Sequence, residues 1–269
     1  IILNVPYLGG SHLPDITLIT PIFELGEAAA EAQLIGFAAN RAHHSDVGGI
    51  SPGSMPLATE IYQEGLIIPP LKLWESGQLN RPLLTLLLRN VRTPDERRGD
   101  LTAQLAANRT AERRMQEIVA RWGRTALDEH IEALIAYARR ITEATIATIP
   151  PGSYHFTDWL DDDGIDEQAI PISVTITVQG KQLTADFSAS SLQVRGNVNT
   201  VAAVTRSATY YVLRCLMPDD APMNHGSFMP ITVITPAGSI TNAQPPAGVA
   251  QGNVETSQRL TDVLFGALA

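Results

Sequence analysis

The chain contains little cysteine and no surplus of positive charge. Its single cysteine, Cys215, excludes a framework of intrachain disulfides and is typical of a reducing compartment, so we expect a cytoplasmic protein. Free cysteine is among the most buried residue types, and Cys215 lies in the apolar run 210–217, which predicts a place in the core. The 19 basic residues are outnumbered by 28 acidic ones. We therefore expect no nucleic-acid partner, because such partners require a basic patch.

Several recognisable segments and motifs are also absent. No run reaches the roughly 18 apolar residues of a membrane span, so we expect no membrane partner. The chain has neither a Gly-x-Ser-x-Gly nucleophile elbow nor a Walker A loop, so we expect it not to bind ATP by that route. It starts without methionine in a strand-like pattern and stops inside an apolar helical pattern at residues 259–269, with no signal peptide. The pattern predicts a fragment truncated at both ends.

The apolar pattern predicts three consecutive segments of one larger domain. Residues 1–95 are rich in Gly and Pro and predict a β-rich segment, with strands at 16–20 and 34–39 and a short helical insert at 24–33. Residues 96–150 predict a helical hairpin. Residues 151–269 predict a second β-rich segment with a buried helix. Strands, then helices, then strands and a helix indicate an α+β, multi-layer mixed fold.

Helix and strand boundaries follow from local signals. Thr93-Pro94-Asp95-Glu96 predicts a helix start with Thr93 as N-cap, and Gly123 predicts its end. The expected helices cover residues 81–90, 97–121, 125–148 and 200–217. In the last segment the apolar period becomes two, which predicts strands at residues 153–160, 170–178, 182–187 and 231–235.

Two clusters of histidine and aspartate stand near the start of the chain. The first, Gly9-Gly10-Ser11-His12-Leu13-Pro14-Asp15, separates its two polar side chains by a proline turn. The second contains His43, His44 and Asp46, followed by Gly48-Gly49. Neutral imidazole and carboxylate together suit zinc, manganese or iron(II). Because adjacent side chains of an extended backbone point in opposite directions, only one of the paired histidines should reach a shared site.

The remaining titratable clusters have simpler explanations. We expect His130 on the solvated face of a helix and His155 packed in, or at the edge of, a sheet. His225 lies in a predicted loop. Residues 161–163 with Gly164 lack the spacing and distal glutamate of an EF-hand, so they predict a turn.

Longer stretches of the chain resemble the hydantoinase B/5-oxoprolinase family. The resemblance covers nearly the whole chain, and it is carried by residues 3–15, 36–49, 51–56, 60–65, 90–94, 99–101, 104–108, 186–188 and 224–230. It implies a B-type subunit that works with a hydantoinase A-like partner, either a separate subunit or a fused domain, in a hetero-oligomer. The partner would bind ATP. Together they would open small cyclic amides, namely hydantoins, 5-oxoproline or lactams.

The resemblance also implies a metal-assisted reaction and a set of site residues. His12, Asp15 and His43 match the positions that hold a divalent metal ion in the family, with a further aspartate ligand upstream of these residues. His44 and Asp46 would orient the site or transfer protons. Val5 stands where the family usually has aspartate. The insert at 24–33 leaves both His43 and His44 open as the ligand.

Two other functions remain open at the level of sequence. The related acetone and acetophenone carboxylases share the family's architecture, so a ketone carboxylase subunit is the first alternative. The second alternative is a non-catalytic scaffold for the ATP-binding partner.

Overall fold

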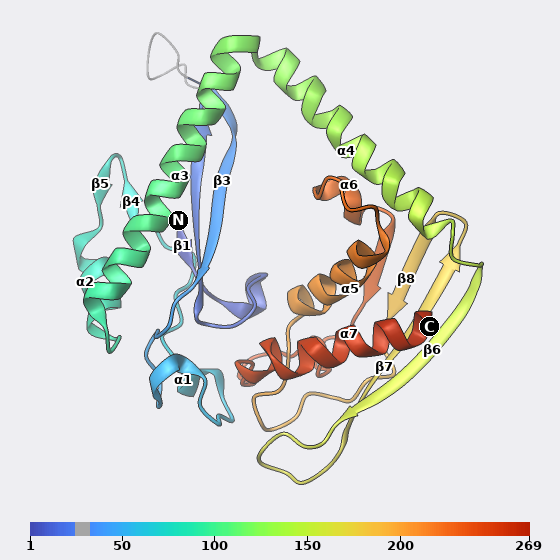
Figure 1. The fold of residues 1–269 in the computed structure, drawn as a ribbon. Coiled ribbons are helices and arrows are strands. Elements are labelled where there is room, and N and C mark those ends of the chain that lie inside the picture. The colour runs from blue at the N-terminus through green and yellow to red at the C-terminus, as the bar shows by residue number, and fades with distance from the viewer. Residues whose placement is uncertain (25–32) are drawn as a thin grey trace. The chain divides into compact units, whose positions relative to one another are not determined.

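The computed structural model describes residues 1–24 and 33–269. By their contacts these residues form two compact units (Figure 1). Unit 1 comprises Ile1–Val5, His12–Pro56 and Glu64–His130, and unit 2 comprises Pro6–Ser11, Leu57–Gln63 and Ile131–Ala269. The three segments expected from the sequence (residues 1–95, 96–150 and 151–269) differ from these two units, and the division into three segments stays a prediction. The helical insert expected at 24–33 lies largely outside the described residues.

Unit 1 is built on a three-stranded antiparallel sheet of β1 (Ile2–Leu3), β2 (Asp15–Phe23) and β3 (Leu34–His43), in that order. Both strands expected from the alternating pattern are confirmed, and both are longer than predicted. In the register of β2 and β3, the first residue of one strand faces the last residue of the other, which pairs Asp15 with His43. This pairing therefore brings the two histidine–aspartate clusters together at one end of the β2–β3 strand pair.

Helix α3 (Pro94–Trp122) packs against β2 and β3 (Figure 1), and α2 (Arg81–Arg89) packs against α3. Thr93 holds the N-cap position and Gly123, with φ of 81°, ends the helix, as predicted. The Thr93 side chain makes no capping bond, because its hydroxyl accepts a hydrogen bond from Arg97 instead. The unit is completed by the short strands β4 (Trp74–Glu75) and β5 (Gln78–Leu79).

Unit 2 contains a four-stranded sheet in the order β6–β7–β8–β9, formed by β6 (Gly152–Leu160), β7 (Ile170–Gln179), β8 (Gln182–Asp186) and β9 (Ile231–Ile234). All four predicted strands are confirmed. Neighbours are antiparallel except β8 and β9, which are parallel. Helix α7 (Glu255–Leu268) packs against β6, β7 and α5 (Ala202–Leu216) (Figure 1). The core between these elements is mainly apolar, with Ile172, Ile176, Leu183, Phe187 and Leu264 completely buried.

The remaining helices are α4 (Arg124–Ile146), which continues from unit 1 into unit 2, and the short α1 (Ile61–Glu64) and α6 (His225–Phe228). Short 3-10 turns cover Pro6–Leu8, Pro52–Ser54 and Gln251–Asn253. Helices and strands follow each other in blocks, which confirms the α+β class. Among the described helices, none combines the length and apolarity that crossing a membrane requires.

The prediction that Cys215 is buried was wrong. Helix α5 buries Val204, Ala208 and Val212, and the thiol is exposed. Cys215 follows Val212 by three residues and Tyr211 by four, and it shares the exposed side of the helix with Tyr211. An apolar run that surrounds a cysteine therefore does not decide which face of a helix carries it.

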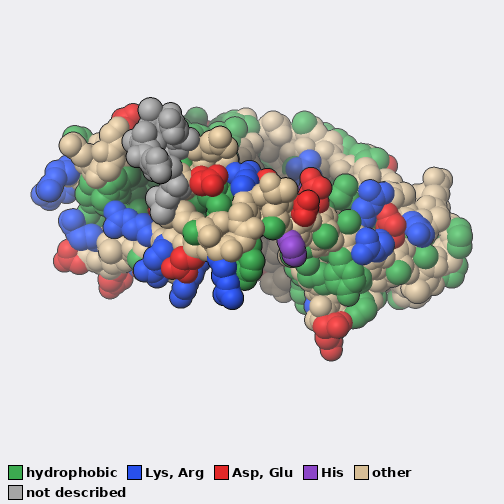
Figure 2. Space-filling view, turned by 90° about the horizontal axis from the view of Figure 1, so that it is seen from above, with side chains coloured by type: hydrophobic (Ala, Val, Ile, Leu, Met, Phe, Trp, Pro, Cys, Tyr) green, Lys and Arg blue, Asp and Glu red, His purple; other side chains and the backbone are tan. Residues whose placement is uncertain are grey.

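On the face shown in Figure 2, basic and acidic side chains are interspersed with apolar ones. Ion pairs between residues one helical turn apart occur on α3 and α4, including Arg114–Glu117 at 2.7 Å and Arg139–Glu143 at 2.6 Å. Such exposed pairs contribute little to stability, about 0.3–0.5 kcal/mol each.

Candidate metal centre

The strand pair β2–β3 and the turn before β2 bring three of the predicted site residues together. The amide of Asp15 donates to the carbonyl of His12 at 3.1 Å, so the turn through Pro14 returns the chain toward its own start. The amide of His44 donates to the carbonyl of Pro14 at 2.8 Å, which ties the end of β3 to this turn. His12, Asp15 and His43 consequently meet in unit 1.

These three side chains form a compact cluster. Asp15 lies between the two imidazoles, with Oδ2 at 3.3 Å from His12 Nδ1 and Oδ1 at 3.2 Å from His43 Nδ1. The two rings are stacked, with centroids 5.0 Å apart. One candidate ligand atom from each residue lies within 4.8 Å of the others. His12 is 1% exposed, whereas the His43 side chain is 53% exposed, so the cluster opens to solvent on one side.

The hydrogen bonding of His12 tests whether these residues fit a metal ion. Both ring nitrogens of His12 are buried without a hydrogen bond among the described residues, and the contact of Nδ1 with Asp15 at 3.3 Å is an ion-pair contact only. Leaving a buried polar atom unpaired costs about 1–3 kcal/mol, which a ligand would offset. The separations of 3.3 and 3.2 Å join the histidines to different oxygens of Asp15, and one ligand atom from each of the three residues lies within 4.8 Å of the others. Ligands at about 2.0–2.1 Å from one tetrahedral ion lie about 3.3 Å apart, so a small movement of the side chains would bring them to an ion. The nitrogen and oxygen donors therefore fit zinc, manganese or iron(II).

His44 lies outside this cluster, on the other face of the strand end. Its Nε2 is 2.9 Å from Gln104 Oε1, and its Nδ1 is 3.9 Å from an oxygen of Asp100. Burial lowers the pKa of His44 and outweighs the raising effects of the Gln104 hydrogen bond and the Asp100 charge. Of the paired histidines, the structure places His43 with His12 and Asp15.

The carboxylate of Asp46 forms one ion pair and accepts hydrogen bonds from two backbone amides. Its Oδ2 accepts from Arg92 at 2.7 Å, and its Oδ1 accepts from the amides of Gly48 and Arg92. Burial raises the pKa of Asp46, but these hydrogen bonds outweigh burial and hold the pKa below its usual value. Asp46 thus shapes the Gly48–Gly49 loop as a group that is charged at neutral pH.

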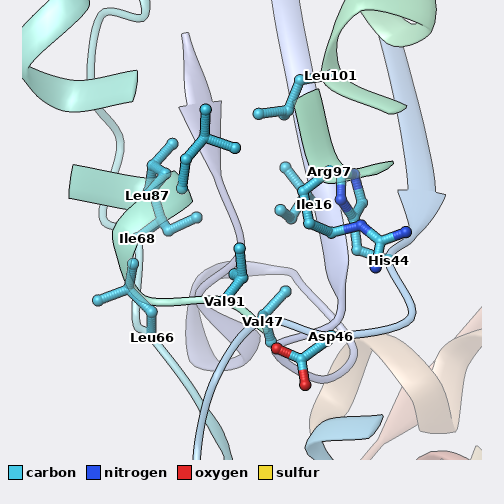
Figure 3. A pocket seen from close by; sticks show the side chains of 11 residues that line it. Ile16, His44, Asp46, Val47, Leu66, Ile68, Leu87, Val91, Arg97 and Leu101 are labelled. Atoms are coloured by element: carbon cyan, nitrogen blue, oxygen red, sulfur yellow. The ribbon is translucent and has the colours of Figure 1, made fainter. Parts of the chain in front are cut away.

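A small cavity lies beside His44 and Asp46. Figure 3 shows Leu66, Ile68 and Leu87 facing it from one side and His44 and Arg97 from the other. Its volume is about 20 Å³ and its walls are mostly apolar, so it has room for about one water molecule. A substrate therefore does not fit there, and the open side of the cluster at His43 is the accessible one.

Substituting Asp46 should reveal its structural role in a pH-dependent way. We expect Asp46→Asn to lower the free energy of unfolding at pH 7 by about 1–3 kcal/mol, since it weakens hydrogen bonds to a buried charge. Because the folded pKa is depressed, the stability from Asp46 is present above about pH 4 and is lost as the pH falls through the folded pKa. Urea unfolding of wild type and Asp46→Asn at pH 7 and pH 3 measures the difference in their free energies of unfolding, and the exposed Asp128→Asn is the control. If the difference between wild type and Asp46→Asn is the same at both pH values, the assignment is wrong.

Comparison with known proteins identifies the family. The profile of the hydantoinase B/oxoprolinase family matches residues 1–269. The chain belongs to this family. Its relatives include the 5-oxoprolinase of Dictyostelium discoideum, 36% identical over 99% of this chain and 21% of the relative.

Two solved structures show the same fold. The caprolactamase of Pseudomonas jessenii superposes with a TM-score of 0.91 at 30% identity, over 100% of this chain and 45% of that one. A nucleotide-free acetone carboxylase superposes with a TM-score of 0.87 at 21% identity, over 99% of this chain and 36% of that one, which shows the fold alone. The chain thus spans less than half the length of these proteins.

Sequence reasoning missed two residues that support the candidate site, Asn4 and Gln104. Asn4 is buried and its amide donates to the carbonyls of Leu13 and Leu66, while its oxygen accepts from the amide of Ile68 at 2.7 Å. It holds the turn that carries His12, and it directly precedes Val5, the departure from the family pattern. The other missed residue is Gln104. Its signal was a glutamine and an asparagine four residues apart on one face of a helix, since Gln104 and Asn108 are both buried.

His130, His155 and the acidic turn lie where expected, whereas His225 does not. His130 and His155 are exposed, and His155 Nδ1 is 3.2 Å from the Thr175 hydroxyl across the sheet. His225 is exposed but begins α6 rather than lying in a loop. Residues 161–164 form a turn, in which buried Asp163 accepts hydrogen bonds from the amides of Asp166 and Gly196, both at 2.7 Å.

Proposed function

We propose that this chain is the metal-holding part of the B subunit of an ATP-dependent enzyme that opens cyclic amides. The observation that carries the proposal is the buried, hydrogen-bond-deficient imidazole of His12 beside Asp15 and the solvent-facing His43. The 5-oxoprolinase and caprolactamase relatives act on cyclic amides by name, which supports the substrate class. The P. jessenii caprolactamase has a subunit beta, 32% identical over 98% of this chain, which supports action with a partner subunit.

In this proposal each residue of the centre has a role that follows from its burial and its charge. When bound, a divalent ion supplies Lewis acidity toward a carbonyl oxygen or lowers the pKa of a water molecule. His12 would hold the ion from the buried side, and Asp15 would supply the negative charge. His43 would close the ligand set at the solvent side, where a substrate can approach. His44 and Asp46 would support the strand end and the glycine loop, since both are engaged by buried partners.

Ring opening needs the amide to be activated in addition to the metal ion, because amides resist attack by water. In this proposal the hydantoinase A-like partner uses ATP to phosphorylate the amide oxygen, which activates the ring carbon toward water. The subunit described here then presents the activated amide to water. Water adds to the activated ring carbon, and the ring carbon–nitrogen bond breaks as the nitrogen takes up a proton. A second water then releases phosphate from the resulting acyl phosphate and leaves the carboxylate. The reaction belongs to hydrolysis of a carbon–nitrogen bond in a ring, with 5-oxoproline, hydantoins and lactams as the substrate class.

The test is a reconstitution of the complete subunit with its ATP-binding partner. We expect ring opening of 5-oxoproline, hydantoin or caprolactam that requires ATP, the partner and a divalent metal ion. It is measured as the phosphate released and the product formed, which is an amino acid from 5-oxoproline or caprolactam and an N-carbamoyl amino acid from hydantoin. Activity should disappear after dialysis against a chelator and return with metal. ATP-dependent consumption of bicarbonate with acetone, without any ring opening, would assign a ketone carboxylase instead. Neither reaction, in a subunit that still binds its partner, would favour a scaffold.

A further inference from the structure

Helix α3 turns a row of amide side chains toward the β2–β3 strand pair. Gln104 and Asn108, one helical turn apart, are both buried. Asn108 Nδ2 donates to the carbonyl of Leu18 at 3.2 Å and lies 3.1 Å from the Thr20 hydroxyl. Asn40 of β3 donates to the Asn108 side chain at 2.7 Å and to the backbone carbonyl of Gln104 at 2.8 Å. These bonds connect the helix to both strands.

Gln104 differs from the rest of the row because it bonds at the end where the candidate metal ligands lie. Its Nε2 donates to the carbonyl of Ile16, the residue after Asp15, at 2.9 Å. The same nitrogen donates to Asn40 Oδ1 at 2.8 Å, so both of its protons are used. Its Oε1 is then left to accept from Nε2 of His44, the residue after His43, at 2.9 Å. One side chain thus holds the neighbours of two ligands.

The two ligands need such support because of their place in the sheet. Asp15 is the first residue of β2 and His43 is the last of β3, so both stand at the end of the strand pair, where strands fray. Their ring and carboxylate atoms are only 3.2 Å apart, and a shift of either strand end would change that separation. Outer groups that orient metal ligands are required for tight metal binding in general.

We propose that Gln104 is the positioning residue of the metal centre, acting through Ile16 on Asp15 and through His44 on His43. The inference rests on the proposed metal function of the cluster. Gln104 touches none of the three candidate ligands, so it sets the geometry and not the identity of the donors. Asn108, with the same kind of bonds one turn farther along, holds the strands but not their ligand-bearing ends.

The test compares Gln104→Met with Asn108→Leu in the complete subunit, by competition for Zn²⁺ against a chelating indicator and by visible absorption of the Co²⁺ form. We expect Gln104→Met to raise the Kd for Zn²⁺ by roughly 10–100-fold and to change the Co²⁺ spectrum. Asn108→Leu, which loses a comparable set of buried bonds, should keep the wild-type Kd within about twofold. A Gln104→Met subunit that binds Zn²⁺ as tightly as wild type, or an Asn108→Leu subunit that loses as much affinity, overturns the inference.

Two further results keep the outcome unambiguous. If Gln104→Met fails to fold, Gln104→Asn replaces it. Asparagine keeps both polar atoms but is too short to reach Ile16 and His44 together, so the same rise in the Kd for Zn²⁺ is expected. An unchanged Kd overturns the inference. A wild-type subunit that binds no Zn²⁺ overturns the metal centre itself. If the wild type binds Zn²⁺ tightly and the Gln104 variants bind it equally tightly, only the positioning role is overturned.

Discussion

Replacing Asp15 with asparagine is expected to lower kcat of the complete enzyme on the order of 10³-fold. Asparagine keeps the shape of the side chain but removes the one negative charge between His12 and His43, whose ring nitrogens lie 3.3 and 3.2 Å away. A neutral amide is a poorer ligand for a hard or borderline cation, so the site loses the ion and the chemistry that the ion supplies. Ring opening with saturating ATP and substrate measures the effect.

The matched control for this variant is Asp166→Asn. Asp166 is also an aspartate with a charged partner, Arg195 at 3.0 Å, but it is exposed and lies in unit 2. Asp166 is not part of the candidate metal cluster and its exposed ion pair contributes little to stability, so kcat should change by less than about twofold. A fully active Asp15→Asn enzyme would show that the cluster plays no part in catalysis.

The largest effect on stability is expected from Gly252→Ala in unit 2. A methyl group at this position would lie 1.8 Å from the backbone oxygen of Asn199 and 2.4 Å from its carbonyl carbon. Backbone atoms cannot rotate away as a side chain does, and the amide of Gly252 is also bonded to the Asn197 carbonyl at 3.0 Å. We expect a loss of about 4 kcal/mol or more, which lowers Tm by about 10 °C in a chain of this size.

Gly99→Ala provides the control for that variant. Gly99 lies in α3 with no atom within 4 Å of the position of an added methyl group. Alanine is the better helix former, so this variant should gain about 0.5–1 kcal/mol. Thermal unfolding of both variants decides the matter: equal Tm values for Gly252→Ala and wild type would mean that the loop at Asn199 is not packed as described.

The fold was largely predictable because its strands and helices alternate apolar and polar residues in clear periods. β2, β3 and the four strands of unit 2 follow from a period of two, and α3 starts and ends at Thr93 and Gly123 as expected. The exposure of Cys215 was not predictable in the same way, because the face of α5 that meets the core depends on tertiary packing.

The candidate site was predictable in its residue types but not in its pairing. The resemblance to the family implied His12, Asp15 and His43, and the alternation of side chains allowed only one of His43 and His44 to join the cluster. The register that sets Asp15 opposite His43 decides which one, and a register depends on contacts across the sheet. Gln104 escaped prediction because its spacing from Asn108 shows that the two share one face of a helix, but not that this face is buried.

The metal content of the complete subunit, purified without chelator beside its Asp15→Asn variant, tests the central claim most directly. Elemental analysis should find about one zinc, manganese or iron per wild-type chain and a large loss in the variant, because His12, Asp15 and His43 supply the donors. Wild-type protein that carries no metal, in a subunit that is folded and binds its partner, would contradict the account.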